Sequence, residues 1–461
     1  MSIIRAYALP HPPLAIPGVG RGQEDGISAT IRSFHEVASE IAELAPDAVV
    51  FITPHNVIYA DYFHISPGAS ASGGFERFND MKTKLFAQYD EPLAREIIRL
   101  AGTHGIPAGH MGEKDPKLDH GVTVPMWFLN SHYTAYKTLR ISQSGMDPSQ
   151  HYKLGQIIAE ASENIGEKTV LIGSSDLSHK LTREGPYGFA PEGPEFDAAV
   201  VKALSSGNFA DLFNIPDTLR ENAAECGYNS LMVLAGCFDR RNVSARLLSY
   251  EGPFGVGYAI AAFSAGASDD DRCFLDSYEK SRLDEALERK GSEDLYRILA
   301  RQSLEHTIIN GESLTLPVDL PDELLKKKAG VFVTLYKNGR LRGCIGTTAP
   351  TTGSVAAEII QNAVSAGLRD PRFDPVAVSE LPYLTYKVDE LFPPESIDSS
   401  EKLDVKRYGV IVSSGARRGL LLPNLDGVDT VDEQIAIARR KAGISEHAAI
   451  KLERFEVIRH E

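Results

Sequence analysis

The feature that most constrains this chain is an alternation, from Ile3 to Phe263, of apolar β-branched runs with segments of helical hydrophobic spacing. Residues 3–9 and 47–53 read as strands, whereas residues 27–44 and 92–101 carry helical periodicity. Such alternation is typical of an α/β domain built around a largely parallel sheet. We therefore expect a three-layer αβα domain, with helices on both faces of the sheet.

The length of 461 residues exceeds what one ordinary core organises, so we expect more than one domain. Residues 264–272, Ser-Ala-Gly-Ala-Ser-Asp-Asp-Asp-Arg, are small, polar and acidic, which is typical of a linker. We predict a first domain over residues 1–265, a linker and lead-in helix over 266–283, and a second domain over 284–461.

The second domain has a mixed pattern. Residues 274–289 and 295–309 read as helices. Two strand-like runs, 331–336 and 340–345, flank Lys337-Asn338-Gly339, and Asn-Gly favours the positive φ angles of a tight hairpin turn. We expect a smaller α+β domain.

Composition excludes several classes of protein. A net charge of −15 argues against nucleic-acid binding, which needs a concentrated cationic surface. The sequence has no signal-peptide pattern and no apolar run of the roughly 18 residues that a membrane-spanning helix needs, so we expect neither export nor a membrane partner. The four cysteines form no C-x-x-C pair, which fits a reducing cytoplasm and predicts neither disulfides nor a structural zinc site.

Three histidines stand at or just beyond the ends of apolar strand-like runs. They are His11, His55 and His179, and the first two follow Pro10 and Pro54. Proline removes a backbone donor and tends to stop a strand. Because the carboxyl ends of parallel strands share one edge of a sheet, where ligands bind, we expect these histidines to converge there.

These motifs are similar to those of a known family. Leu-Pro-His at 9–11, Thr-Pro-His at 53–55, Leu-Asp-His-Gly-Val-Thr-Val-Pro at 118–125 and Ser-Asp-Leu-Ser-His at 175–179 resemble the ordered motifs of class III extradiol ring-cleaving dioxygenases. The resemblance implies a non-haem Fe(II) site in which two histidines and one carboxylate occupy one face of the ion. His11 and His55 correspond to the two histidine ligands.

The third ligand has two candidates in Ala-Glu-Cys-Gly-Tyr at 224–228. Glu225 stands where the family places its carboxylate. In the Memo family, which shares this fold, a cysteine occupies the corresponding motif, so Cys226 is the alternative. Glu225 is also the kind of acidic residue that is favoured at a helix N-terminus without any ligand role.

Two more histidines match the family's active site. His179 corresponds to its acid–base histidine, and an unperturbed pKa near 6.5 suits removal of a proton from an aromatic hydroxyl. Alternatively, His179 is a fourth metal ligand or a histidine packed in a loop. His120 corresponds to a histidine that hydrogen-bonds a substrate oxygen or dioxygen. Alternatively, His120 is a structural histidine that pairs with Asp119.

The mechanism implied by this resemblance is binding of a catechol-type or aminophenol-type aromatic and dioxygen at Fe(II), followed by ring opening. No organic cofactor is required. A homo-oligomeric protein is compatible with this mechanism.

The C-terminal part resembles a second family, the AMMECR family. The resemblance rests on Leu-Arg-Gly-Cys-Ile-Gly at 341–346 and Leu-Arg-Asp-Pro-Arg-Phe-Asp-Pro at 368–375, and it implies no chemistry. Cys344 has no neighbouring histidine in the sequence to activate it, which favours a structural strand cysteine. Three arginines, Arg342, Arg369 and Arg372, either line an anion-binding cleft or are solvated or paired with Asp370 and Asp374.

Two other functions compete with the dioxygenase. One is a Memo-like metal-binding or scaffold module without dioxygenase turnover, working with radical-enzyme partners, since Memo-type and AMMECR domains are associated in such a system. The other is a metal-dependent hydrolase that uses a bound hydroxide. The sequence contains no H-E-x-x-H motif, and it has an acid at Glu225, which together favour the dioxygenase.

Overall fold

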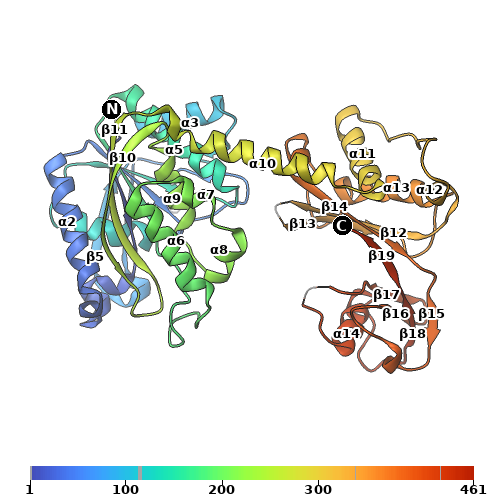
Figure 1. The fold of residues 1–461 in the computed structure, drawn as a ribbon. Coiled ribbons are helices and arrows are strands. Elements are labelled where there is room, and N and C mark those ends of the chain that lie inside the picture. Colours follow the sequence, from blue (N-terminus) through green and yellow to red (C-terminus); the bar gives the residue numbers. More distant parts are fainter. Residues whose placement is uncertain (1–2, 113–116, 338, 426) are drawn as a thin grey trace. The chain divides into compact units, whose positions relative to one another are not determined.

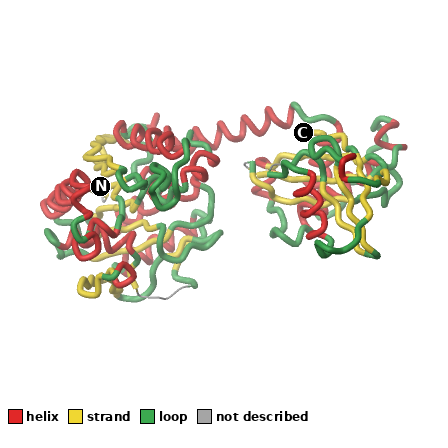
Figure 2. The backbone as a smooth tube through the Cα atoms, turned by 90° about the horizontal axis from the view of Figure 1, so that it is seen from below, coloured by secondary structure: helices red, strands yellow, loops and turns green. Residues whose placement is uncertain are grey.

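The computed structural model describes residues 3–112, 117–337, 339–425 and 427–461. The chain divides into two compact units, residues 1–278 and 279–461, and the division falls inside helix α10 (Phe274–Gly291). Both units contain helices and strands (Figures 1 and 2). The expected combination of a first α/β domain with a smaller second domain is confirmed.

A six-stranded sheet forms the centre of the first unit. Its order is β10-β11-β1-β9-β2-β8. The strands are β1 (Ile3–Leu9), β2 (Ala48–Thr53), β8 (Lys137–Ser142), β9 (Thr169–Ser174), β10 (Arg241–Glu251) and β11 (Tyr258–Ser268). The pairs β1·β9, β9·β2 and β2·β8 are parallel, whereas β10 and β11 form an antiparallel hairpin along β1. The predicted largely parallel sheet is therefore present.

Helices cover both faces of this sheet (Figure 1). On one face lie α3 (Glu91–Thr103), α5 (Pro148–Ile165), α6 (Glu192–Ser206) and α9 (Tyr228–Gly236), and on the other lie α2 (Ser28–Leu44) and α4 (His120–Asn130). Successive residues of β2 point to opposite faces, so Val50 and Ile52 join the first core while Val49 and Phe51 join the second. Because both faces are buried, every residue of β2 is buried, which explains its continuous apolar sequence.

A smaller antiparallel hairpin lies beside α4. It consists of β4 (Ser70–Phe75) and β5 (Asp80–Gln88), joined through the short helix η3 (Glu76–Phe78), and β7 (Lys117–Leu118) pairs with β4. Asn79 ends η3 in the left-handed conformation, with φ of 65°. The remaining short elements of this unit are η1 (Pro13–Ala15), α1 (Pro17–Gly20), η2 (Gln23–Ile27), β3 (Phe63–His64), β6 (Ala108–Gly109), α7 (Ala210–Phe213), α8 (Asp217–Ala223) and η4 (Asp270–Arg272).

Residues 264–272, which we expected to form a linker, lie partly in regular secondary structure. The first half of this segment continues β11, where Ser264, Ala265 and Ser268 pair with residues of β10. Small residues are compatible with a strand when a partner strand satisfies their backbone groups, and the composition alone does not reveal that partner. The second half includes η4, in which Asp269 accepts a hydrogen bond from the backbone N–H of Asp271.

The second unit contains two four-stranded sheets, ordered β13-β12-β14-β19 and β15-β18-β16-β17. The first has β12 (Gly330–Lys337), β13 (Arg340–Gly346), β14 (Leu384–Leu391) and β19 (Val457–His460), and it packs with α11 (Leu295–Asn310), α12 (Asp322–Lys326) and α13 (Val355–Leu368). The second has β15 (Glu395–Ile397), β16 (Gly409–Ser414), β17 (Arg417–Leu421) and β18 (Lys451–Phe455), and α14 (Val431–Lys441) packs on it. Two short helices are η5 (Val378–Tyr383) and η6 (Ser400–Lys402).

The predicted hairpin in the second unit is present as the antiparallel pair β12·β13. Of the predicted turn Lys337-Asn338-Gly339, Asn338 lies outside the described residues. Gly339 has φ of 77°, a conformation that glycine adopts at little cost.

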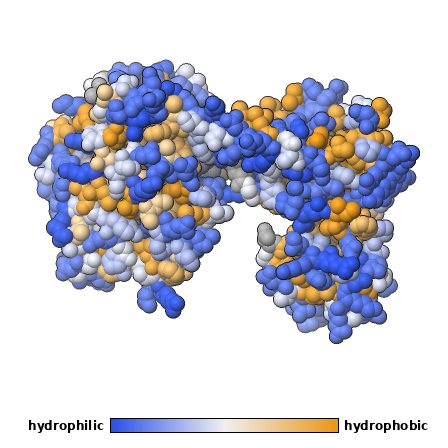
Figure 3. Space-filling view, viewed as in Figure 1, coloured by the Kyte–Doolittle hydropathy of each residue, from blue (hydrophilic) through white to orange (hydrophobic). Residues whose placement is uncertain are grey.

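Hydrophilic side chains predominate on the face of each unit drawn in Figure 3, with hydrophobic ones interspersed. Among the described residues, every helix is too short or too polar to cross a membrane.

Candidate metal centre

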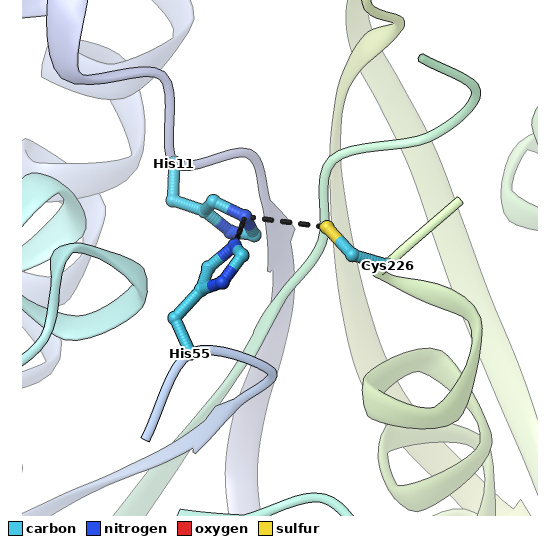
Figure 4. Close-up of side chains that lie close together, drawn as sticks. All are labelled: His11, His55 and Cys226. Carbon is cyan, nitrogen blue, oxygen red and sulfur yellow. Dashed lines mark hydrogen bonds between the residues drawn. The ribbon is translucent and has the colours of Figure 1, made fainter. Parts of the chain in front are cut away.

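The candidate site lies at the carboxyl edge of the parallel strands. His11 follows β1, His55 follows β2, and Ser174 ends β9, the strand between them. Because these three strands are parallel, their carboxyl ends share one edge, and the expected convergence of His11 and His55 occurs there. Cys226 reaches the same place from the turn that precedes α9 (Figure 4).

Three side chains form a compact donor group. The Nε2 atoms of His11 and His55 are 2.9 Å apart, and the Sγ atom of Cys226 is 3.4 Å from Nε2 of His11. One ligand atom from each residue lies within 4.8 Å of the others. The imidazoles and the thiol point toward one another (Figure 4).

These separations fit one metal ion. Two nitrogen ligands at about 2.1 Å from an ion and at right angles to each other lie about 3.0 Å apart, and a nitrogen and a sulfur ligand lie about 3.1–3.6 Å apart for angles between 90° and 109°. The observed separations of 2.9 and 3.4 Å are close to these values. Imidazole and thiolate together suit iron, zinc and copper.

Hydrogen bonding fixes the tautomer of His11. The Oγ of Ser174 is 2.6 Å from the carbonyl oxygen of Gly121 and 2.8 Å from Nδ1 of His11. A hydroxyl has one proton, and the carbonyl can only accept, so Ser174 donates to Gly121 and accepts from Nδ1–H of His11. The Nε2 of His11 therefore carries a lone pair, and this lone pair faces His55 and Cys226.

His179 has the same tautomer by a similar argument. Its Nδ1 is 2.5 Å from the carbonyl oxygen of Ala224, so Nδ1 carries the proton and donates it. The Nε2 is then a bare acceptor, 4.0 Å from Sγ of Cys226. Burial lowers the pKa of His179, although the bond to Ala224 opposes this, so the ring is neutral near pH 7. The structure thus brings His179 to the edge of the donor group, where its free nitrogen can accept a proton.

His120 stacks on His55, with ring centroids 3.9 Å apart and an interplanar angle of 23°. Asp119, which precedes it, accepts a hydrogen bond of 2.6 Å from the hydroxyl of Thr53. Arg140 is buried, and its Nη1 lies 3.5 Å from the other oxygen of Asp119. Asp119 therefore ties the segment carrying His120 to the segment carrying His55, rather than pairing with the His120 ring.

Glu225 takes a different position from the one expected. Its Oε2 accepts a hydrogen bond of 2.7 Å from the backbone N–H of Tyr228, the first residue of α9. Burial raises the pKa of Glu225, while this bond and the charge of Arg220 oppose the rise. The structure brings Cys226, not Glu225, to His11 and His55, because the carboxylate is used at the start of the helix.

Sequence reasoning missed Asp176. One oxygen of its carboxyl accepts a 2.7 Å hydrogen bond from the backbone N–H of His11, and the other lies 3.6 Å from Nε2 of His11. Burial raises the pKa of Asp176 to about 7. The available signal was its place in Ser-Asp-Leu-Ser-His directly after β9, in which only His179 was singled out.

Burial governs the charge state of the whole group. It lowers the pKa of His11 well below the usual value, with the neighbouring histidines adding to the effect. Burial also lowers the pKa values of His55 and His120 to about 4. The pKa of Cys226 is raised well above its usual value by burial, followed by the charges of Asp176 and Glu225. Neutral imidazoles are ready to bind a cation, and a bound cation would compensate the cost of forming a buried thiolate.

The second unit has no comparable donor group among the residues described. Cys344 accepts a hydrogen bond from the hydroxyl of Thr334 at 3.2 Å, and burial raises the pKa of its thiol. Arg342 pairs with Glu380, and Arg372 pairs with Asp370. The partner of Arg372 is the one expected from the sequence, whereas Arg342 has Glu380 in place of Asp370 or Asp374. Arg369 is exposed.

Relatives of the whole chain and of its parts can be identified. Protein CA_C1420 of Clostridium acetobutylicum is 40% identical over 468 residues, covering 100% of this chain and 99% of that protein. A protein of Thermotoga maritima is 48% identical over 159 residues, 34% of this chain and 91% of its own length. The crystal structure of Protein PH0010 from Pyrococcus horikoshii is 33% identical over 36% of this chain and 89% of its own, with a TM-score of 0.34.

Two family models match separate parts of the sequence. Residues 5–261 match the model described as the catalytic LigB subunit of aromatic ring-opening dioxygenase. Residues 298–460 match the AMMECR1 model. The chain therefore belongs to the family of the catalytic LigB subunit of aromatic ring-opening dioxygenase and carries a C-terminal AMMECR1 domain.

Proposed function

We propose that the first unit is an Fe(II)-dependent enzyme that uses dioxygen to open the ring of a catechol-type or aminophenol-type aromatic. His11, His55 and Cys226 would hold the ion. The observation that carries this proposal is the meeting of two imidazole nitrogens and one thiol at the carboxyl edge of the sheet. Membership of the ring-opening dioxygenase family supports the reaction class.

An Fe(II) ion held by His11, His55 and Cys226 would supply a Lewis acid for the aromatic hydroxyl and a redox centre for the reaction with dioxygen. The protein's own part in the reaction begins with His179. Its Nδ1–H is held by the carbonyl of Ala224, so its bare Nε2 is the atom that takes a proton from the substrate hydroxyl. His120, which stacks on His55, would hydrogen-bond a substrate oxygen.

Asp176 acts through His11 in this proposal. It accepts the backbone N–H of His11 and so holds the loop after β1 in the position that presents the imidazole. Ser174 holds the other side of the same ring through Nδ1. These two contacts come from the end of β9 and the loop after it, so they align the ligand of one strand with the neighbouring strand.

A thiol at the third position favours a second candidate. The extradiol pattern has a carboxylate there, whereas this structure presents Cys226. The second candidate is a Memo-like metal-binding module that works with radical-enzyme partners and does not turn over dioxygen. For either function we place the protein in the cytoplasm, because its four cysteines are free thiols and a reducing compartment keeps them so.

The test uses the full-length protein purified without oxygen. Its metal content would be measured first, followed by oxygen uptake with catechol, 2-aminophenol and 3,4-dihydroxybenzoate. The same protein stripped of metal by a chelator is the control. Stoichiometric iron and metal-dependent oxygen uptake with a ring-opened product would support the dioxygenase. Tightly bound iron with no uptake for any of these aromatics would reject it in favour of the Memo-like module.

A further inference from the structure

Cys226 lies in a short turn, residues 224–227, between helices α8 and α9. Such a turn lacks the backbone pairing of a helix or a strand, so contacts from other segments determine where its side chains point. The loop after β9 holds the start of the turn, because the carbonyl oxygen of Ala224 accepts a hydrogen bond from His179. The peptide of Cys226 itself is held by a different segment.

That segment is the one directly after β8, which carries Gln143. The Nε2 of Gln143 donates to the carbonyl oxygen of Cys226 at 3.0 Å and to the hydroxyl oxygen of Ser230 at 2.7 Å. A carbonyl oxygen can only accept, so the amide nitrogen and not the amide oxygen stands here. Ser230 donates its own proton to the carbonyl oxygen of Ile52 at 3.3 Å. Both amide protons of Gln143 are therefore used.

The backbone of Gln143 is tied to the segment that carries His55. Its N–H donates to the carbonyl oxygen of Thr53 at 3.0 Å, and Thr53 ends β2 two residues before His55. Gln143 is only 6% exposed, so little water competes for these hydrogen bonds. One residue thus connects the turn of Cys226 to the end of the strand that presents a histidine of the centre.

We propose that Gln143 is a positioning residue of the metal centre. Its amide holds the backbone of Cys226, so that the thiol, and not the adjacent carboxylate of Glu225, faces the two histidines. This inference rests on the proposed function, because Gln143 acts only through a proposed ligand. Replacing a residue that orients a metal ligand without touching the ion typically weakens metal binding about 10–100-fold.

The test uses the full-length protein, stripped of metal by a chelator and titrated with Co²⁺ without oxygen. A cobalt–thiolate bond gives a charge-transfer absorption in the near ultraviolet, and Cys226→Ala supplies the spectrum without this thiolate. Gln143→Leu removes both donors. We expect it to bind Co²⁺ roughly 10–100-fold more weakly than the wild-type protein and to lose most of the thiolate absorption.

Two further variants separate positioning from general stability. Gln143→Glu keeps the size of the side chain but places an acceptor against the carbonyl of Cys226, so it should behave like Gln143→Leu, and it decides the question if the leucine variant does not fold. Ser230→Ala also removes a buried hydrogen bond of Gln143 but leaves the bond to Cys226, so it should keep the wild-type affinity and absorption. Circular dichroism checks that each variant is folded.

The proposal is overturned if both Gln143 variants keep the wild-type affinity and thiolate absorption, or if Ser230→Ala loses them equally. A wild-type protein without thiolate absorption would overturn the ligand set and this inference with it. Loss of the absorption in the Gln143 variants alone would support the inference even in a protein that consumes no oxygen, and only the dioxygenase proposal would then fail.

Discussion

The Nε2 of His55 lies 2.9 Å from the Nε2 of His11, and the hydrogen bond from Nδ1 of His11 to Ser174 leaves the His11 nitrogen without a proton. The residues that follow β1 and β2 thus bring two imidazole nitrogens close together. A bound cation gives this close approach a direct physical reason, because both lone pairs can then face the same charge.

Replacing His11 and His179 should separate a ligand from a base. His11→Ala removes one of the three proposed metal ligands and should abolish iron binding. His179→Ala should leave iron content nearly intact while lowering turnover by about 10²–10⁴-fold, because an acid–base group assists proton transfer without holding the ion. Iron content and oxygen uptake should be measured on the same preparations. Equal loss of iron in both variants would make His179 a ligand.

Gly121→Ala should disturb the pair His55 and His120. A Cβ at Gly121 would lie 2.3 Å from the hydroxyl oxygen of Thr53 and 2.9 Å from Asp119, so the hydrogen bond between them must shift. We expect a loss of about 1–3 kcal/mol in the free energy of unfolding, together with weaker metal binding.

Gly102→Ala is the matched control for that change. Gly102 lies in α3, and a Cβ there meets nothing within 4 Å. The free energy of unfolding of this variant should be unchanged or higher by up to about 1 kcal/mol, because alanine is a better helix former than glycine. Urea unfolding of both variants provides the comparison. An equal loss of unfolding free energy in the two variants would contradict the assigned role of Gly121.

Asp197 should make stability depend on pH. Burial raises its pKa to about 7, although the Ser178 N–H and the Tyr250 hydroxyl donate to it and oppose the rise. Between about pH 4 and 7 the folded protein therefore binds more protons at this group than the unfolded chain does. The free energy of unfolding should fall as pH rises through this window, by at most about 1.4 kcal/mol per pH unit for one group.

Asp197→Asn should reduce that slope, since the amide does not titrate. The measurement is the free energy of unfolding in urea at several pH values from 4.5 to 7.5, compared with the wild-type protein. Asp176 is unchanged in this variant and should keep its own part of the slope, because burial also raises its pKa to about 7. Parallel pH profiles for the two proteins would show that Asp197 is not the titrating group.

In the second unit, Glu358 should be a large contributor to stability. This buried carboxylate accepts hydrogen bonds from the hydroxyls of Thr347, Thr351 and Thr352 and from the backbone N–H groups of the last two. Burial alone would raise its pKa, but these bonds outweigh burial, so the pKa is lowered. Its contribution is present above the unfolded-state pKa and is lost as pH falls through the folded-state value.

Glu358→Ala would leave several of these donors unpaired, and we expect the second unit to lose about 2–4 kcal/mol. Differential scanning calorimetry of the full chain should show a lower transition for the second unit and an unchanged one for the first. Ser365→Ala offers a control on the same helix, because its exposed hydroxyl donates to the carbonyl oxygen of Gln361 within the helix. If Glu358→Ala lowered the stability of the second unit as little as Ser365→Ala does, the role given to Glu358 would be contradicted.

Much of the fold was predictable because both faces of the central sheet are covered. A strand buried on both sides must be apolar throughout, so β2 is visible in the sequence as an uninterrupted run. The end of β11 was not predictable from its small residues, because strand pairing depends on β10, which composition does not reveal.

At the site, the residues that directly follow strands could be predicted, since parallel strands determine where His11 and His55 lie. The third donor could not be predicted, because Glu225 and Cys226 are adjacent in a turn. Ala224 there takes the left-handed conformation, with φ of 53°, and the geometry of that turn decides which side chain faces the histidines. Only the structure shows that Cys226 does.

The proposed ligand set is tested most directly by the iron content of Cys226→Ala and Glu225→Gln, measured beside the wild-type protein after anaerobic purification. Glu225→Gln keeps an oxygen that can accept from Tyr228, so helix α9 should remain intact. We predict that Cys226→Ala loses its iron while retaining the circular dichroism of the folded protein, and that Glu225→Gln keeps iron at the wild-type level. Loss of iron from Glu225→Gln with full retention in Cys226→Ala would contradict the ligand set of His11, His55 and Cys226.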